Sequence, residues 1–178
     1  MSKRTPLYAA LFGLGICGCT AAEPANQTST AVVQSLRNLH NTTQQNITAT
    51  AEMLSEEIYA FQPTEEVRTA GQILAHVANA QYLFCSAAAG EENPNAENFE
   101  ETRTTKDQIV AALGQAFAYC EGVYDNTTDA SSTHAATFFG NANTVAGILA
   151  FNSAHNYEHY GNLVTYMRIN GIVPPSSM

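Results

Sequence analysis

The sequence predicts an all-α fold in which four long helices form a bundle. Four segments of the 178-residue chain carry apolar residues at the three- and four-residue spacing of a helix with one buried face. Cap residues, glycine or proline mark most ends of these segments. No run of alternating β-branched residues indicates a strand that would compete with them.

The first two predicted helices lie in the N-terminal half. The first covers residues 30–60 and ends before Pro63, and its apolar residues keep helical spacing: Val33, Leu36, Ile47, Leu54 and Ile58. The second begins where Thr69 and Gln72 have the spacing of a capping box. Its apolar stripe runs out at Gly90 and contains Ile73, Val77, Ala80 and Phe84.

The third helix starts near Thr104 or Thr105, after a polar stretch, and has one apolar face: Ile109, Leu113, Phe117 and Cys120. A looser region follows at residues 125–143. We expect its Ala-Thr-Phe-Phe-Gly segment to form a short turn of helix, whose Phe138 and Phe139 would plug one end of the bundle.

The fourth predicted helix lies near the C-terminus. Asn143 or Thr144 would cap its start, and it would run to Asn170. Gly171 follows as a C-terminal stop, with two prolines shortly beyond it.

The first residues have the layout of a secretory signal. Lys3 and Arg4 supply the charged start, and residues 7–16 are an apolar stretch too short to span a bilayer. The Ile-Cys-Gly-Cys that follows resembles the lipobox of bacterial lipoproteins. We therefore expect a signal peptide over residues 1–19, with lipidation at Cys19.

Ordinary cleavage after Ala22 is the alternative. Residues 20–30 resemble a flexible tether, and residues 31–178 have the length of one domain. The expected location is outside the cytoplasm, in a bacterial envelope or periplasm, with the lipid anchor as the sole membrane contact.

The charge balance bears on partners. The chain has 7 Lys+Arg against 16 Asp+Glu, a formal charge of −9. Nucleic acid requires a basic face, so we expect no nucleic-acid partner.

Two histidines lie four residues apart on the fourth predicted helix. Helical spacing places His155 and His159 on the same face as Ile148 and Leu163, which should point into the bundle. Two imidazoles one turn apart can bind one ion. The alternative is a pair of neutral imidazoles that are hydrogen-bonded in the core.

A third histidine favours the metal. His76 lies on or beside the buried stripe of the second helix, between Ile73 and Ala80. An unpaired buried polar group costs about 1–3 kcal/mol, and one shared ion would satisfy all three rings. Three imidazoles leave a coordination position for water or substrate. We expect a divalent ion, zinc or nickel, bound by His76, His155 and His159.

At these residues the chain resembles the DinB-like metalloproteins, whose relatives include bacillithiol transferases and mycothiol-dependent maleylpyruvate isomerases. The resemblance rests on "GQILAHVANAQYLFC" and "AHNYEHYGNLVTYMRINGIVPPSS" and extends from about residue 30 to the C-terminus. In that family one histidine of the second helix and a His-x-x-x-His pair of the fourth bind the metal, and His76, His155 and His159 match them. The tail of the pattern is matched as well, by Gly161, Tyr166, Arg168, Gly171, Pro174 and Pro175.

Two positions depart from the family pattern. Tyr160 stands where an arginine is frequent, and Asn162 replaces a glutamine. A substrate contact of that arginine therefore does not carry over.

The resemblance implies that the second and third helices run parallel and are joined by a long crossover. Residues 91–103 form a connection long enough for this, able to reach about 40 Å. Cys85 and Cys120 would then lie at the same level, and we expect a disulfide between them in an exported protein. Two buried thiols are the alternative.

Two functions follow from the resemblance and the predicted export. The first is a metal-dependent thiol transferase or hydrolase, with the catalytic residues beyond the metal ligands unknown. The second is a non-catalytic envelope lipoprotein that binds a metal or a small ligand. A metal site walled off by Phe138, Phe139 or Tyr160 would favour the second. The resemblance also implies a homodimer.

Other polar residues have smaller expected roles. Glu158 should be exposed rather than a base at the site, and Asn152 and Asn162 either orient a ligand or pack as polar residues. His40 and His134 have no partner at ligand spacing, so we expect both to face solvent or lie in loops.

Overall fold

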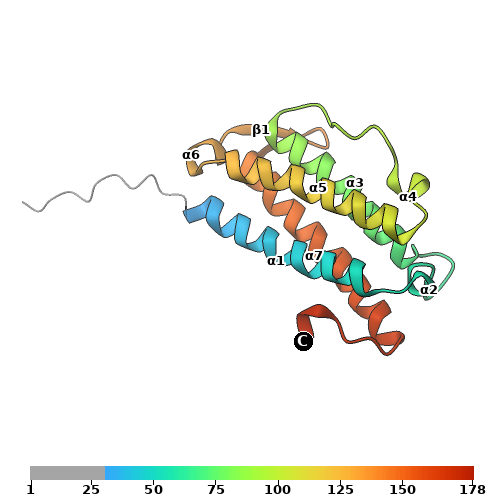
Figure 1. The fold of residues 1–178 in the computed structure, drawn as a ribbon. Helices are drawn as coiled ribbons and strands as arrows, with labels where there is room; N and C mark the ends of the chain where they lie inside the picture. Colours follow the sequence, from blue (N-terminus) through green and yellow to red (C-terminus); the bar gives the residue numbers. More distant parts are fainter. Residues whose placement is uncertain (1–30) are drawn as a thin grey trace, which may run out of the picture.

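Four long helices build the protein, in a computed structural model that describes residues 31–178 (Figure 1). They are α1 (Ala31–Met53), α3 (Ala70–Ala89), α5 (Lys106–Asn126) and α7 (Val145–Ile169). The short elements are α2 (Glu56–Tyr59), α4 (Phe99–Thr102), α6 (Asp129–Ser132), β1 (Ala135–Phe138), β2 (Asn141–Thr144) and the 3₁₀ turn η1 (Pro175–Ser177). The predicted four-helix bundle is confirmed.

Helices α3 and α5 lie side by side and run parallel (Figure 1). Near the start of both helices, a Cβ on Gly71 would lie 3.5 Å from Ile109 Cδ1. Near their ends, the Cα atoms of Cys85 and Cys120 are 5.4 Å apart. Parallel neighbours need a crossover as long as the helices, and the segment that carries α4 supplies it, as predicted.

Cys85 and Cys120 are joined by a disulfide, the pairing that the sequence predicted. Both residues are fully buried. The bond joins residues 35 positions apart in the sequence and links the C-terminal half of α3 to that of α5.

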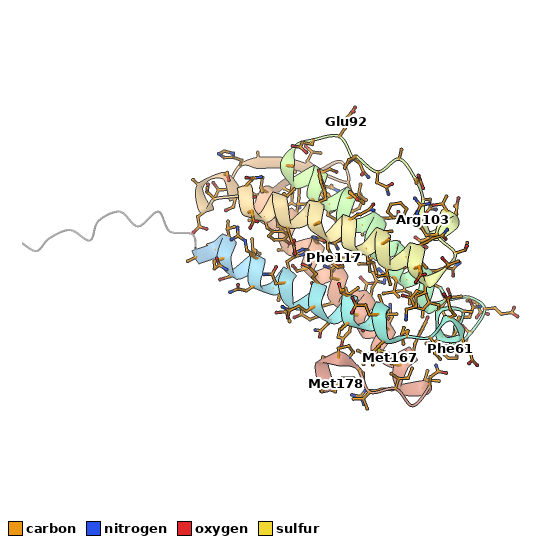
Figure 2. All side chains as sticks on the ribbon, in the orientation of Figure 1. Phe61, Glu92, Arg103, Phe117, Met167 and Met178 are labelled. Carbon is orange, nitrogen blue, oxygen red and sulfur yellow. A yellow bond between two sulfur atoms is a disulfide. The ribbon has the colours of Figure 1, made fainter. Side chains whose placement is uncertain are left out.

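The core fills the space between the four helices along their length. Figure 2 shows Phe117 and Met167 between the helices, and Glu92 on the outer crossover. Around Phe117 and Met167 lies the larger apolar cluster, while a smaller one surrounds the disulfide and includes Phe84 and Phe138. Within residues 31–178 no helix is long and apolar enough to cross a bilayer. The predicted signal, tether and lipidation site at Cys19 lie outside the described residues.

The first predicted helix is shorter than expected. It ends at Met53, and the chain restarts as α2 after Ser55. Ser55 has an extended backbone, and its hydroxyl accepts a hydrogen bond from Ile58 N at 3.4 Å. A capping serine that precedes two glutamates favours a new helix start over a continuous helix.

The expected helical turn around Phe138 is wrong, because these residues form a β-hairpin. Strands β1 and β2 pair antiparallel, with Ala135 opposite Thr144 and Phe138 opposite Asn141. Phe139 and Gly140 make the two-residue turn, and both have positive φ. Four-residue strands are too short to show a period in the sequence. Of the two expected plugs, Phe138 is buried and Phe139 is exposed.

The solvent-facing position expected for His40 is also wrong, whereas His134 is exposed as expected. His40 is 0% exposed, and its ring stacks on Tyr124 with centroids 4.4 Å apart. Neither ring nitrogen has a hydrogen-bond partner among the described residues. Burial lowers the pKa of His40 to about 4, so its ring is neutral at pH 7 and packs as an aromatic residue.

Removal of the disulfide should destabilise the fold. Loss of a cross-link of this loop length costs about 3–4 kcal/mol in unfolding free energy by the chain-entropy account. We expect the double variant Cys85→Ala/Cys120→Ala to unfold at lower urea concentration than the oxidised protein. Equal unfolding free energies for the two proteins would contradict a native disulfide.

Acid should destabilise the protein through His40. Its folded pKa of about 4 lies below the ordinary value of 6.5, so the unfolded chain binds a proton in this window that the folded chain does not. Stability should therefore fall as pH drops from 6.5 to 4, with about 3 kcal/mol of the loss due to His40.

The variant His40→Phe keeps an aromatic ring against Tyr124 and removes the titration. Urea unfolding at pH 7 and pH 4.5 should show a smaller pH-dependent loss for this variant than for the parent. The matched control, His134→Phe, changes an exposed histidine and should keep the full loss. Identical pH dependence of the unfolding free energy in His40→Phe and the parent would show that His40 does not cause the loss of stability in acid.

Candidate metal centre

The three histidines predicted as ligands come from two helices whose starts are firmly capped. On α3, Thr69 and Gln72 form the predicted capping box, which places His76 two turns into the helix. On α7, the Thr144 hydroxyl accepts a hydrogen bond from Gly147 N at 3.1 Å. His159 is buried and His155 and His76 are half-buried, so the face of α7 predicted to point inward does so.

A network of buried amides sets the register between α3 and α7. The Gln81 side-chain amide donates to Asn156 Oδ1 at 2.7 Å, and Gln81 Oε1 accepts from Asn152 Nδ2 at 3.0 Å. Asn156 in turn donates to Thr43 Oγ1 on α1 at 3.1 Å. These four polar residues are fully buried. Asn152 and Asn156 bracket His155 on α7, so the network holds that ring at the level of His76.

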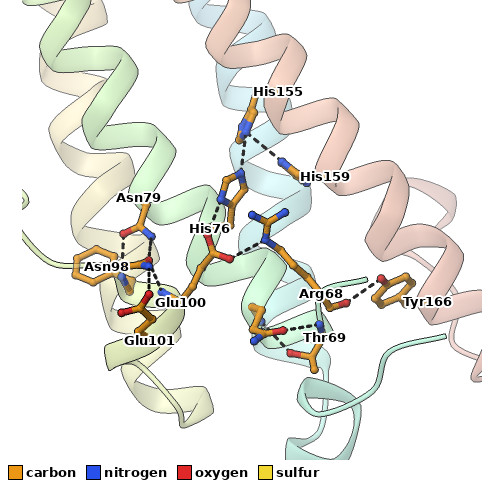
Figure 3. Close-up of polar contacts among 12 residues, drawn as sticks. Arg68, Thr69, His76, Asn79, Asn98, Glu100, Glu101, His155, His159 and Tyr166 are labelled. Carbon is orange, nitrogen blue, oxygen red and sulfur yellow. Dashed lines mark hydrogen bonds and ion pairs between the residues drawn. The ribbon is translucent and has the colours of Figure 1, made fainter. Parts of the chain in front are cut away.

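The structure brings the three predicted histidines together (Figure 3). Nε2 of His155 lies 3.1 Å from Nε2 of His76 and 3.0 Å from Nε2 of His159. One nitrogen from each of the three rings lies within 4.8 Å of the others. The three rings thus point one nitrogen each at a common place between α3 and α7.

The two histidines of α7 are neutral at physiological pH. Burial, followed by repulsion from His159 and His76, lowers the pKa of His155 to about 3. Burial and then His76 lower the pKa of His159 to about 4. Neutral imidazole has a free lone pair, which is the form that binds a metal ion.

A glutamate that the sequence analysis did not single out orients His76. Glu100 Oε1 lies 2.7 Å from Nδ1 of His76, and Glu100 Oε2 accepts from Arg68 Nε at 2.6 Å (Figure 3). Partial burial would raise the pKa of Glu100, but its bonds to Arg68 and His76 outweigh burial and lower it. The carboxylate therefore accepts the Nδ1 proton of His76, which leaves the Nε2 lone pair directed at the other two rings.

The backbone of Arg68 is itself held in place by α7. Its backbone carbonyl accepts a hydrogen bond from the Tyr166 hydroxyl at 2.9 Å (Figure 3). Glu100 lies on α4 in the crossover, among several acidic residues with no distinctive spacing. The one signal that could have predicted it is chemical, because a metal-binding histidine usually donates its second N–H to a carboxylate.

The donor set fits a divalent ion. Metal–nitrogen bonds of 2.0–2.1 Å in a tetrahedral site place the nitrogens about 3.3 Å apart, close to the two short Nε2 separations. Nδ1 of His155 and Nδ1 of His159 are buried and have no hydrogen-bond partner within the described chain. These two rings therefore interact through Nε2. A proton on Nε2 of His155 points at one neighbour, whereas one cation accepts a lone pair from all three rings.

Two cavities open beside the three histidines. One has a volume of about 370 Å³, and its lining includes His76 and His155. The other has a volume of about 680 Å³, and its lining includes His159 and Arg68. The histidines thus lie between two spaces that solvent can enter.

The aromatic residues considered as walls do not close the site. Tyr160 is buried, and its hydroxyl donates to Ser176 Oγ at 2.9 Å, away from the histidines. Phe138 packs in the core, and Phe139 lines the 370 Å³ cavity without filling it.

The remaining predicted polar residues have mixed positions. Glu158 and Asn162 are exposed and line the larger cavity. Asn152 is buried in the amide network, where Nδ2 also lies 3.5 and 3.4 Å from the two disulfide sulfurs. Asn152 is therefore a packing residue.

Comparison with known proteins identifies relatives of this chain. The sequence profile of the DinB superfamily matches residues 39–163. The uncharacterized protein YjoA of Bacillus subtilis is 28% identical over 130 residues, which are 68% of this chain and 79% of that protein.

Solved structures show the same fold. A DinB-like protein of Bacillus cereus has a TM-score of 0.66 at 20% identity, over 81% of this chain and 93% of that one. A mycothiol-dependent maleylpyruvate isomerase has a TM-score of 0.59 at 18% identity, over 74% of this chain and 60% of that one. With the sequence profile covering most of the chain, the protein belongs to the DinB superfamily.

Proposed function

We propose that the protein binds one divalent metal ion, zinc or nickel, through His76, His155 and His159, and uses it in a transfer or hydrolysis reaction. One observation carries the proposal. Three imidazoles direct their nitrogens at one place, with two separations of 3.0 and 3.1 Å. Imidazole is a good ligand for both metals.

An open coordination position supports catalysis over simple metal storage. Three protein ligands leave at least one position free, and an ion held in this way lowers the pKa of a thiol or water that reaches it. His76 and His155 line a cavity of about 370 Å³, so a substrate can approach. Structural metal sites, by contrast, have four protein ligands.

The protein's own residues would tune the site. Glu100 holds the proton on Nδ1 of His76 and makes that ring a stronger donor. Arg68 forms an ion pair with this carboxylate. The structural likeness to a mycothiol-dependent isomerase supports a thiol among the reactants.

We also propose that the reaction takes place outside the cytoplasm. The signal-like residues 1–19 and the lipobox-like cysteine Cys19 support export and anchoring. The buried disulfide between Cys85 and Cys120 suits an oxidising compartment. An exported enzyme of this kind would draw its thiol or water from the envelope.

Metal content tests the proposal. Protein purified without chelators or affinity histidines should contain about one equivalent of zinc or nickel by elemental analysis. His155→Ala removes the central ring of the cluster and should lower the content to below about 0.1 equivalent. His134→Ala, at an exposed histidine remote from the cluster, should retain the metal. Absence of stoichiometric metal from the parent protein would refute the proposal.

The same protein tests the open coordination position. After exchange of the bound metal for Co²⁺, added azide should shift the visible absorption spectrum in a saturable way. A spectrum that azide does not change would show a closed site and assign the protein a binding role.

Glu100 should raise metal affinity without binding the ion. Glu100→Gln keeps the shape of the side chain and removes the charge that orients His76. We expect metal affinity to fall 10- to 100-fold, the usual cost of such a change, in a competition titration with a chromogenic chelator. Glu101→Gln makes the same change at the exposed neighbour and should leave affinity unchanged. Equal losses in both variants would show a general charge effect.

A further inference from the structure

The smaller cavity beside the histidines has an aromatic wall. Phe84, Phe139 and Phe151 line it together with His76 and His155. The ring of Phe84 meets those of Phe139 and Phe151 nearly edge-on, with centroids 6.2 and 5.3 Å apart. Phe84 also packs edge-on against the His155 ring at 5.0 Å. The wall therefore leads from the surface to the histidine cluster.

Phe139 occupies a position that local preferences do not explain. It has φ of +48° in the hairpin turn, where asparagine or glycine is preferred and a bulky residue is an outlier. Its side chain is also 64% exposed. Strained backbone positions of this kind are concentrated at active and ligand-binding sites, where the surrounding structure maintains them.

The hairpin holds the exposed ring at the cavity. The Phe139 ring packs on Phe138 with centroids 4.2 Å apart, and Phe138 is anchored in the core by Phe84 at 5.3 Å. Phe151, one turn of helix from His155, is also exposed. Two exposed rings from different elements thus face one cavity.

The opposite side of the cavity is polar and ordered. Asn79 Oδ1 accepts from Phe99 N at 3.0 Å, and Asn79 Nδ2 donates to Asn98 Oδ1 at 2.9 Å. Glu97, the carboxylate in the lining, pairs with Arg103 at 2.8 Å. Among the described residues that line the cavity there is no lysine or arginine. A phosphate or carboxylate would therefore find no basic side chain of this kind along the cavity wall.

We infer that this cavity binds a small, uncharged molecule by a planar apolar group, which lies on Phe84, Phe139 and Phe151. Its volume of about 370 Å³ is at the small end of ligand pockets. Bound in this way, the molecule would place one of its donor atoms at the free coordination position of the proposed metal, beside His155. This second part rests on the proposed metal, whereas the aromatic site does not.

The metal-loaded protein tests both parts with two hydroxamic acids that share one metal-binding group. Benzohydroxamic acid should bind at least 10-fold more tightly than acetohydroxamic acid by calorimetry. Phe139→Gly should reduce this ratio to below 3 and leave the affinity for acetohydroxamic acid unchanged. Glycine suits the positive φ, so this variant should keep the hairpin. Val173→Gly, at an exposed apolar residue elsewhere, should retain the full ratio.

The metal-free protein tests the aromatic site alone. The neutral fluorophore N-phenyl-1-naphthylamine should bind saturably at one site, and its affinity should fall at least 5-fold in Phe139→Gly and in Phe151→Ala. Fluorophore binding with no binding of either hydroxamic acid would support the aromatic site and refute the proposed metal function.

Two results would overturn the inference. The first is an unchanged ratio of hydroxamic acid affinities in Phe139→Gly. The second is a dimer, detected by light scattering, that dissociates in Phe139→Gly while the parent binds no fluorophore. That result would assign the exposed rings to contact with a second copy of the chain.

Discussion

The hydrogen bonds of Gln81 with Asn152 and Asn156 are the constraint on which the site depends. All three side chains are fully buried, and an unpaired buried amide costs about 1–3 kcal/mol. A slip of α7 along α3 by one residue would break both bonds at once. Apolar packing alone tolerates such small shifts, because it is not directional. The amides therefore fix the register that brings His155 to His76.

A second constraint comes from the crossover. Parallel α3 and α5 require a long connection, and this connection carries α4 with Glu100. Asn79 on α3 accepts the backbone N–H of Phe99, so α4 is fastened one turn from His76. A segment that the topology requires thereby also supplies the carboxylate that orients a histidine.

The surroundings of the histidines differ on their two sides. Toward the hairpin the cavity is aromatic and has no lysine or arginine in its described lining, whereas Arg68 and Glu158 line the larger cavity. Reactants of different polarity could therefore approach from different sides. The exposed ring of Phe139 marks the aromatic side as a recognition surface in our proposal.

The sequence by itself determined the four helices and the pairing of two histidines on one helical face, since both follow from local spacing and from capping at residues such as Thr69 and Thr144. It also predicted the Cys85–Cys120 pairing, once parallel helices were inferred from the family resemblance. Only the tertiary structure decided the partner of His76, the burial of His40 and the hairpin at Phe139. Glu100 and His40 acquire their roles from contacts with residues more than 20 positions away, which no local period encodes. The hairpin has four-residue strands, which are too short to appear as a pattern in the sequence. Packing of Phe138 against Phe84 stabilises these strands in the fold.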